Sequence, residues 1–306
     1  MRILIYGAGV LGCNLARNLL RSNKDVTLLA RGEWAKEIKE NGLRIKDKFH
    51  LGTSVTQIPV VTTLTKEDIY DVIFVVLRYN QIPSIMDILR ENKTKNIVFV
   101  GNNVETEELT KALPEKNVLF AFASSAGYRA KDKVVSTDLR KITIGPLSNG
   151  KKDLIDRIFK DTKYKVCCEE KIGDYLLCHA AFVLPLVFAC YYTNGNLKKI
   201  KRDKPYIHKL INANIEGYRA IQNAGHKILP TSDEKFESPK YRKTCYRFIR
   251  LLFATKLGEI MLSDHAMHAV DEMKAMNEDM KRLFDRSGAK YPTWQELEKD
   301  IPEGFI

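Results

Sequence analysis

The sequence predicts an α/β fold: an N-terminal, doubly wound parallel sheet followed by an all-helical C-terminal domain. A glycine turn joins the first strand to the first helix, and strands then alternate with helices until about residue 168. From about Ile172 onward, every long periodic segment is helical. We therefore expect two domains, residues 1–168 and residues 169–306. A chain of 306 residues that is 44% hydrophobic is long enough to build both cores.

The first strand, residues 2–6, is short and apolar, and it runs into the spacing Gly7-x-Gly9-x-x-Gly12. Residues 13–21 then carry leucines at helical spacing. Gly7 permits a tight turn, Gly9 lets the backbone approach a pyrophosphate, and Gly12 lets the helix pack close to the strand. This pattern predicts a dinucleotide site, the alternative being an ordinary strand–loop–helix connection.

Two further residues of this turn belong to the predicted cofactor site through their backbone. Val10 and Leu11 lie at the N-terminus of the first helix. Backbone N–H groups and the helix dipole favour an anion there. We expect both residues to contact the cofactor's phosphates in a domain of the Rossmann type.

The residue that ends the second strand predicts which nicotinamide cofactor binds. Residues 25–30 form an apolar strand, and Arg31 follows it about 20 residues beyond the glycine turn. An acidic residue at this position accepts hydrogen bonds from a ribose 2′-hydroxyl, whereas an arginine pairs with a 2′-phosphate. Arg31 therefore favours NADP(H), and a solvated surface arginine is the alternative.

Later strands supply two more candidate residues at their carboxyl ends. Residues 42–61 suggest a hairpin or two short strands, and residues 70–76 and 96–100 are buried strands, each followed by a helix, at 82–89 and 107–113. Ligands of open α/β sheets bind at the carboxyl ends of strands. Arg78 is therefore a candidate for a phosphate or the adenine, and Asn102 for the nicotinamide or the substrate. A surface arginine and a loop-stabilising asparagine are the alternatives.

The remaining elements complete the two domains. Residues 118–123 and 141–145 are expected to be strands on either side of a loop at 124–127, and residues 151–160 a helix. Helices are expected at 174–191, 206–224, 239–257 and 264–286. Gly225 and Gly288 are expected stop signals for two of them.

Composition and charge exclude several classes of function. The six cysteines lack any paired C-x-x-C spacing, so we expect neither a zinc site nor disulfides. The net charge of +12 is spread along the chain, and its densest run, residues 198–204, has no interleaved aromatics, so we expect no nucleic-acid partner. The apolar run at 176–193 contains His179 and Pro185, so it falls short of the roughly 18 uncharged apolar residues expected of a spanning helix, and we expect a buried core helix. Met1 leads almost directly into the first strand, without a signal peptide, which predicts a cytoplasmic location.

Together the glycine turn, Arg31, the strand ending in Gly-Asn-Asn and the helical second half resemble the ketopantoate reductase (2-dehydropantoate 2-reductase) family. The resemblance implies that NADPH reduces a small 2-oxo acid in a cleft between the two domains. It makes Arg31 the 2′-phosphate contact and Asn102 the family's strand-end asparagine, while Arg78 falls where the family usually has lysine. Residues 214–230, and residues 270–272 with Asn277 and the Gly-x-x-x-Pro at 288–292, resemble the family's C-terminal signatures. Glu272 then falls on its substrate-site glutamate.

The chain departs from the family pattern on the helix that should carry the catalytic lysine. Pro185 fixes the register, so Leu176 falls on the lysine and Ala180 and Leu184 fall on two asparagines. Val187 falls on a threonine, and Ile260 appears where the family has a serine that helps to hold the substrate carboxylate. Hydride transfer to a ketone develops negative charge on the oxygen, which an ammonium group stabilises and protonates. Leucine does neither.

Histidines near these positions are the candidate replacements. His179 lies three residues after Leu176 on a neighbouring part of the same helix face, so it is a candidate general acid; a satisfied histidine in an apolar helix is the alternative. His265 and His268 precede Glu272 by seven and four residues, on one face of a predicted helix. An ion pair of His268 with Glu272 would position a substrate, and for His265 we expect a solvated or interhelical role. No metal site is expected.

Three functional hypotheses follow from the sequence. The first is an NADPH-dependent reductase acting on a carbonyl or imine substrate more apolar than ketopantoate. The second is a catalytically silent NADP(H)-binding or redox-sensing protein. The third is a true 2-dehydropantoate 2-reductase with a relocated lysine, for example Lys171. The oligomeric state is left open, with a homodimer as one alternative.

Overall fold

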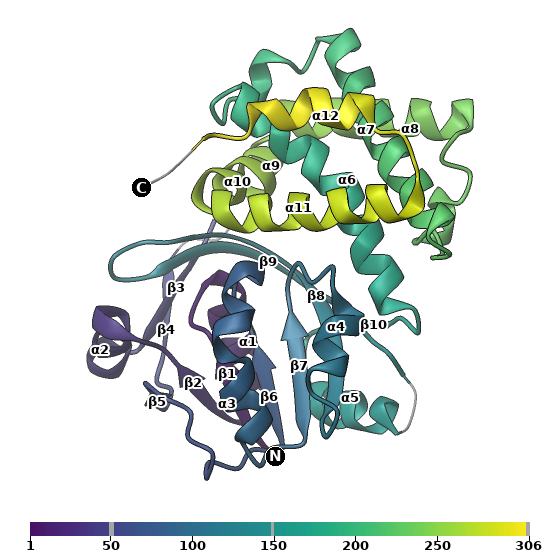
Figure 1. Ribbon diagram of the computed structural model, residues 1–306. Coiled ribbons are helices and arrows are strands. Elements are labelled where there is room, and N and C mark those ends of the chain that lie inside the picture. The colour runs from purple at the N-terminus through teal and green to yellow at the C-terminus, as the bar shows by residue number, and fades with distance from the viewer. Residues whose placement is uncertain (49–51, 148–149, 304–306) are drawn as a thin grey trace. The chain divides into compact units, whose positions relative to one another are not determined.

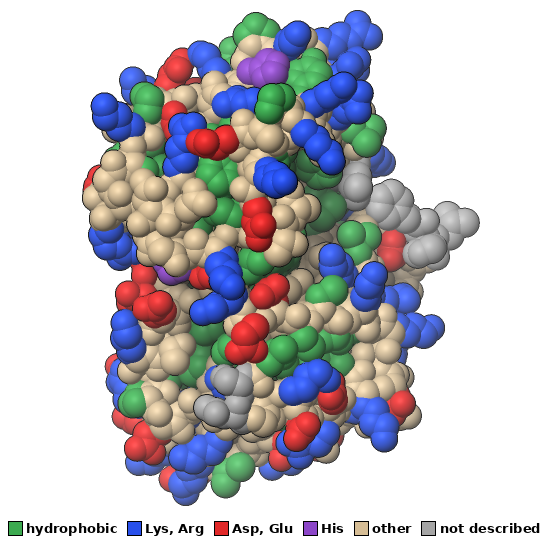
Figure 2. Space-filling view, turned by 90° about the vertical axis from the view of Figure 1, so that its right-hand side faces the viewer, with side chains coloured by type: hydrophobic (Ala, Val, Ile, Leu, Met, Phe, Trp, Pro, Cys, Tyr) green, Lys and Arg blue, Asp and Glu red, His purple; other side chains and the backbone are tan. Residues whose placement is uncertain are grey.

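The computed structural model describes residues 1–48, 52–147 and 150–303. The chain divides into two compact units, Met1–Ile172 and Gly173–Ile306 (Figure 1). Figure 2 shows lysine and arginine side chains scattered over one face, with acidic side chains among them rather than in a separate region.

Within its described residues, the first unit contains one ten-stranded mixed sheet. Its strands are β1 (Arg2–Tyr6), β2 (Asp25–Leu29), β3 (Leu43–Asp47), β4 (Thr53–Thr56), β5 (Val60–Val61), β6 (Val72–Val75), β7 (Asn96–Val100), β8 (Asn117–Arg129), β9 (Val134–Gly145) and β10 (Lys165–Cys168). The strand order is β4-β3-β9-β8-β7-β6-β1-β2-β5, and β10 also pairs with β9. The pairs from β5 through β8 are parallel. The predicted doubly wound α/β fold is confirmed.

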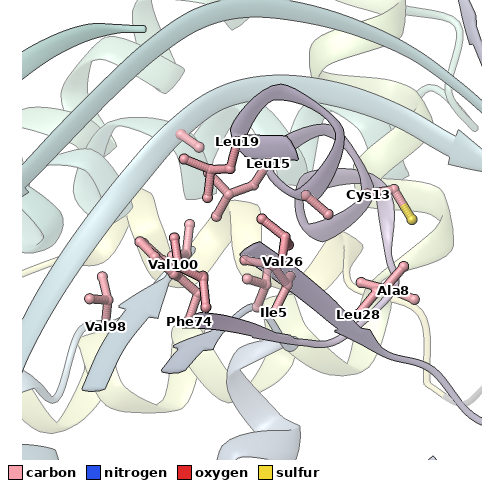
Figure 3. Close-up of a cluster of buried hydrophobic side chains, with 14 of the residues drawn as sticks. Ile5, Ala8, Cys13, Leu15, Leu19, Val26, Leu28, Phe74, Val98 and Val100 are labelled. Atoms are coloured by element: carbon pink, nitrogen blue, oxygen red, sulfur yellow. The ribbon is translucent and has the colours of Figure 1, made fainter. Parts of the chain in front are cut away.

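Helices pack on this sheet because alternate residues of its central strands point to opposite faces. They are α1 (Val10–Leu20), α2 (Gly32–Asn41), the 3-10 helix η1 (Tyr79–Ile85), α3 (Met86–Glu91), α4 (Thr106–Lys111) and α5 (Lys151–Phe159). Leu15 and Leu19 of α1 lie over Ile5, Phe74 and Val100 in one buried cluster (Figure 3). Residues 82–89, expected as one helix, begin as a 3-10 helix that contains Pro83.

The predicted loop at residues 124–127 is wrong, because these residues belong to the long strand β8. Strand β8 pairs with β9 as an antiparallel hairpin, with Ser125 opposite Asp138 and a register shift between Ala123 and Ser125. Small polar residues indicate a turn when they are read alone. Here the Asn14 amide of α1 donates to Ser125 Oγ at 2.9 Å and to Ser136 Oγ at 3.0 Å. The hairpin therefore buries its serines against a helix.

The second unit is helical in its described residues, as predicted. It contains α6 (Ile172–Tyr192), η2 (Leu197–Lys199), α7 (Lys204–Asn223), η3 (Thr231–Asp233), α8 (Pro239–Ala254), α9 (Lys256–Gly258), the π-helical turn η4 (Glu259–Ser263), α10 (Asp264–His268), α11 (Val270–Ser287), α12 (Pro292–Leu297) and η5 (Glu298–Asp300). The single helix expected at 264–286 is wrong, because Ala269, with φ −134° and ψ 36°, interrupts it. No proline or glycine within that range signals the break.

The core of this unit is built around Trp294 of α12, which is fully buried. Its indole N–H donates to Asn277 Oδ1 at 2.8 Å, and the Glu216 carboxylate accepts a hydrogen bond from the Trp294 backbone N–H at 2.9 Å. Asn277 and Glu216 are thus structural, although both lie in segments that resemble family signatures. Among the described helices, α6 is long and apolar enough to cross a membrane; 61% of its apolar window is buried inside the protein. A buried core helix meets the same criterion.

Candidate functional site

The glycine turn after β1 has a backbone that only glycine permits at two positions. Gly7 has φ +122°, and a Cβ atom there would lie 2.2 Å from the carbonyl oxygen of Val76. A Cβ atom on Gly12 would lie 1.9 Å from the carbonyl oxygen of Gly7. Helix α1 therefore starts in direct contact with the end of the strand.

The N-terminus of α1 is open at Gly9. Its first helical hydrogen bond runs from Cys13 N–H to the Gly9 oxygen at 2.9 Å, so the N–H groups of Val10, Leu11 and Gly12 come before it and have no partner inside the helix. In the described structure no side chain caps this end, and the first turn holds no acidic residue. A Cβ atom on Gly9 would meet nothing within 4 Å. The open space and the N–H groups together suit an anion.

Trp34 of α2 forms a hydrogen bond to the glycine turn. The sequence did not predict this residue as part of the site. Its indole N–H donates a hydrogen bond to the carbonyl oxygen of Ala8 at 2.9 Å, and its side chain is buried. Ala8 lies between the first two glycines of the turn. The available signal was a tryptophan placed three residues after Arg31.

The three other candidate residues of this unit follow neighbouring parallel strands, at the carboxyl ends of those strands. The registers pair Tyr6 with both Leu29 and Val75, so β1, β2 and β6 end at one level, and β7 ends beside β6. The exposed Arg31 follows β2 as the N-cap of α2. Beyond the ends of β6 and β7 lie the exposed Arg78 and the half-buried Asn102. The structure thus brings the glycine turn, Arg31, Arg78 and Asn102 to the carboxyl ends of the central parallel strands.

In the second unit, the positions that diverge from the family pattern lie in the hydrophobic core. Leu176, Ala180, Leu184 and Val187 of α6 are each at most 2% exposed. Ile260 is equally buried and lies in the π-helical turn η4, an irregularity that is frequent at functional sites. The expected lysine position therefore holds a core leucine.

His179 of α6 is half-buried in an apolar environment. Desolvation and, second to it, the positive charge of His265 lower the pKa of its imidazole to about 4. His179 is therefore neutral at pH 7. A neutral imidazole donates a hydrogen bond through one ring nitrogen and accepts one through the other.

His265 and Glu272 meet from two separate helices, and His265 is close enough to His179 of a third helix for its charge to lower the pKa of that imidazole. His265 Nε2 of α10 lies 3.5 Å from Glu272 Oε2 of α11, where the carboxylate is buried and the imidazole partly exposed. The interhelical role expected for His265 is thus its observed role. His268, which we expected to pair with Glu272, has its Nδ1 2.7 Å from the Asp264 carbonyl oxygen. Among the described residues, no group of three or more His, Cys, Asp or Glu is placed to hold a metal ion.

Comparison with known proteins identifies the architecture. The chain is 18% identical to 2-dehydropantoate 2-reductase from Geobacter metallireducens GS-15 (98% of this chain and 99% of that chain covered, TM-score 0.77). It is 17% identical to a D-mandelate dehydrogenase solved with NADH and anilino(oxo)acetate (98% and 97% covered, TM-score 0.76). It is 14% identical to a dimeric ketopantoate reductase from Staphylococcus aureus (98% and 97% covered, TM-score 0.73). No curated protein matches the sequence significantly.

A family model gives the assignment by sequence. Residues 3–149, most of the first unit, match the model described as ketopantoate reductase PanE/ApbA. This family and the three structural neighbours all bear the names of oxidoreductases that interconvert a carbonyl and an alcohol. Residues 3–149 of this chain therefore match the ketopantoate reductase PanE/ApbA family, and the whole chain has the fold of the solved ketopantoate reductases.

Proposed function

We propose that this protein is an NADPH-dependent oxidoreductase that reduces a 2-oxo acid or a related carbonyl compound to the alcohol. The observation that carries this proposal is the open N-terminus of α1, which lies beside Arg31 in a domain of the reductase family. Neither a cap nor an acidic side chain competes with a bound anion at this helix end in the described structure.

The residues of the sheet edge fit NADPH. The N–H groups of Val10 and Leu11 would hold the pyrophosphate, because the open space at Gly9 lets it approach the backbone. Arg31 would pair with the 2′-phosphate, since a guanidinium binds phosphate oxygens in a bidentate way. The roles proposed for Arg78 and Asn102 are contacts to the remainder of the cofactor. When bound, NADPH supplies a hydride for the carbonyl carbon.

The negative charge that develops on the substrate oxygen needs a hydrogen-bond donor, and we assign this role to His179. With a pKa of about 4, the imidazole is neutral near pH 7 and would stabilise the oxygen by donating a hydrogen bond, while the resulting alkoxide takes its proton from solvent water to give the alcohol. The buried Glu272 carboxylate, paired with His265, is proposed to orient the substrate. A lysine would instead deliver both a positive charge and a proton, so we expect slower turnover than a lysine-bearing site supports.

The proposed substrate is more apolar than ketopantoate. Leucine, alanine and leucine replace three polar residues of the family's catalytic helix, at Leu176, Ala180 and Leu184. An aliphatic or aromatic 2-oxo acid needs fewer hydrogen bonds from the protein than a hydroxylated one, so it suits this set of side chains better.

The test is NADPH oxidation, followed at 340 nm, with a panel of 2-oxo acids that includes ketopantoate. We expect turnover with apolar members, and we expect His179→Ala and Glu272→Ala to reduce it while NADPH binding persists. Tight NADPH binding without turnover on any panel member would instead support a silent cofactor-binding protein, which the burial of Leu176 in place of a lysine favours. Complementation of a pantothenate auxotroph would identify a true ketopantoate reductase with a relocated donor such as Lys171.

The proposal includes a cytoplasmic location, a small-molecule partner and neither nucleic acid nor membrane as a partner. On the face that Figure 2 shows, basic side chains are scattered among acidic ones, which supports the absence of a nucleic-acid site on that face. A homodimer is the assembly to test first, because one structural neighbour is a dimeric ketopantoate reductase. Light scattering at several protein concentrations measures the oligomeric state directly.

A further inference from the structure

Arg129 is an exposed cation at the end of β8. It contacts an aromatic ring of α2, a helix that is far away in the sequence. Its guanidinium carbon is 5.7 Å from the centre of the Trp34 ring. Among the described residues, no carboxylate forms an ion pair with Arg129. Two other cations near the hairpin turn differ from Arg129, since Asp132 pairs with Arg44 at 3.4 Å and with Lys133 at 3.1 Å.

Trp34 fixes where this guanidinium lies. The indole is buried and donates its N–H to the Ala8 carbonyl oxygen, so the ring sits directly beside the glycine turn. A second observation agrees with this position: burial raises the pKa of the Cys13 thiol in the first half of α1, and the positive charge of Arg129 opposes that rise. Arg129 therefore reaches the surroundings of the turn, although 122 positions separate it from Gly7 (129 − 7).

Arg31 belongs to the same neighbourhood. It is the N-cap of α2, three residues before Trp34, and it is also exposed without an ion pair among the described residues. Residues three apart at the start of a helix lie near one another. Arg31 thus lies at the start of the helix whose indole contacts the Arg129 guanidinium. In Figure 1 the turn of the β8–β9 hairpin lies on the side of the sheet where α2 is found.

We infer that Arg129 is a specificity-determining residue that provides, together with Arg31, a second guanidinium for the 2′-phosphate of NADPH. A phosphate monoester carries close to two negative charges at neutral pH and offers three acceptor oxygens, so two arginines match it better than one. The Trp34 ring holds the second guanidinium by a cation–π contact. The long β8–β9 hairpin then contributes one residue, Arg129, to the cofactor site.

This inference rests on the proposed function, and its experiment separates the two. Binding of NADPH, NADH, 2′,5′-ADP and 5′-ADP is measured by calorimetry for the wild type and Arg129→Gln. We expect Arg129→Gln to weaken NADPH and 2′,5′-ADP roughly 10- to 100-fold and to leave NADH and 5′-ADP within about twofold. If the wild type binds neither NADPH nor 2′,5′-ADP, the proposed function itself fails. If it binds them and Arg129→Gln binds them equally well, only the inference fails.

Two variants control for charge and geometry. Lys131→Gln removes the same charge from the same hairpin turn, so its affinities should stay within about twofold of the wild type unless Arg129 acts only through the general field. Arg129→Lys keeps the charge but loses the planar fork, and we expect an intermediate affinity for NADPH. An equal loss of NADPH and NADH affinity in Arg129→Gln would overturn the inference, because Arg129 would then act on the turn rather than on the 2′-phosphate. An unchanged melting temperature of Arg129→Gln shows that the fold is intact.

Discussion

The indole N–H of Trp34 donates a hydrogen bond to the carbonyl oxygen of Ala8 at 2.9 Å, which ties α2 to the middle of the glycine turn. This bond orients the Ala8 carbonyl toward α2. The turn and the helix that follows β2 are thereby coupled, so changes in α2 are expected to reach the cofactor's phosphates.

Trp34→Phe keeps an aromatic ring but removes the donor. The buried Ala8 oxygen then loses its partner, which we expect to lower the free energy of unfolding by about 1–3 kcal/mol. The affinities for NADPH and NADH should fall together, because both cofactors carry the same pyrophosphate. Urea unfolding, followed by circular dichroism, and calorimetric titrations measure these effects. Unchanged stability would show that the bond is not needed to hold the turn.

Gly9→Ala and Gly12→Ala are a matched pair in the same turn. A Cβ atom on Gly9 meets open space and its backbone angles suit any residue, so Gly9→Ala should fold with near-normal stability while it weakens NADPH binding. A Cβ atom on Gly12 lies 1.9 Å from the Gly7 oxygen, so Gly12→Ala should also lower the melting temperature markedly. Thermal unfolding with and without NADPH tests both. Normal NADPH affinity in Gly9→Ala would contradict the assigned pyrophosphate position.

The pKa of His179 predicts how stability depends on pH. Its pKa falls from 6.5 in the unfolded chain to about 4 in the folded protein, so the unfolded state binds more protons between these values. Stability from this residue is fully present above about pH 6.5 and is lost as the pH falls toward 4. The loss is at most roughly 3.5 kcal/mol, since the pKa falls by about 2.5 units and one pKa unit corresponds to about 1.4 kcal/mol.

His179→Gln removes this titration. Unfolding free energies measured at several pH values between 4 and 8 should therefore show a smaller acid-induced decrease in the variant than in the wild type. Parallel curves for the two proteins would mean that His179 is not buried as a neutral group. NMR titration of the His179 ring gives the pKa independently.

The contact between His265 and Glu272 predicts a separation between binding and turnover. Glu272→Gln should lower kcat/KM for the carbonyl substrate roughly 10²- to 10⁴-fold if the carboxylate orients the substrate or takes part in proton transfer. NADPH affinity should remain within about twofold, because the proposed phosphate contacts all lie in the other unit.

A double-mutant cycle with His265→Ala measures the coupling inside this pair. Residues in contact show interaction energies of about 0.5–3 kcal/mol, so the double variant should lose less activity than the sum of the single variants. Fully additive losses would show that His265 and Glu272 act separately.

The strands and helices around the glycine turn were predictable because their signals are local. Gly7 and Gly12 mark positions where a side chain collides with backbone, and the apolar runs of β1, β2, β6 and β7 mark a sheet covered on both faces. The break at Ala269 had no such signal. The prediction of a loop at residues 124–127 was wrong because the Ser125 hydroxyl accepts a hydrogen bond from Asn14, a partner 111 positions away in the sequence.

The sequence by itself determined the α/β class, the helical second half and an edge of the sheet that carries the glycine turn, Arg31, Arg78 and Asn102, since these follow from residue periodicity and from where each strand ends. Only the tertiary structure decided which distant side chains meet. It placed Arg129 on Trp34, joined His265 to Glu272, and desolvated the half-buried His179 so that its imidazole is neutral. The physical reason is that burial and charge pairing depend on distances between elements, which no local pattern encodes.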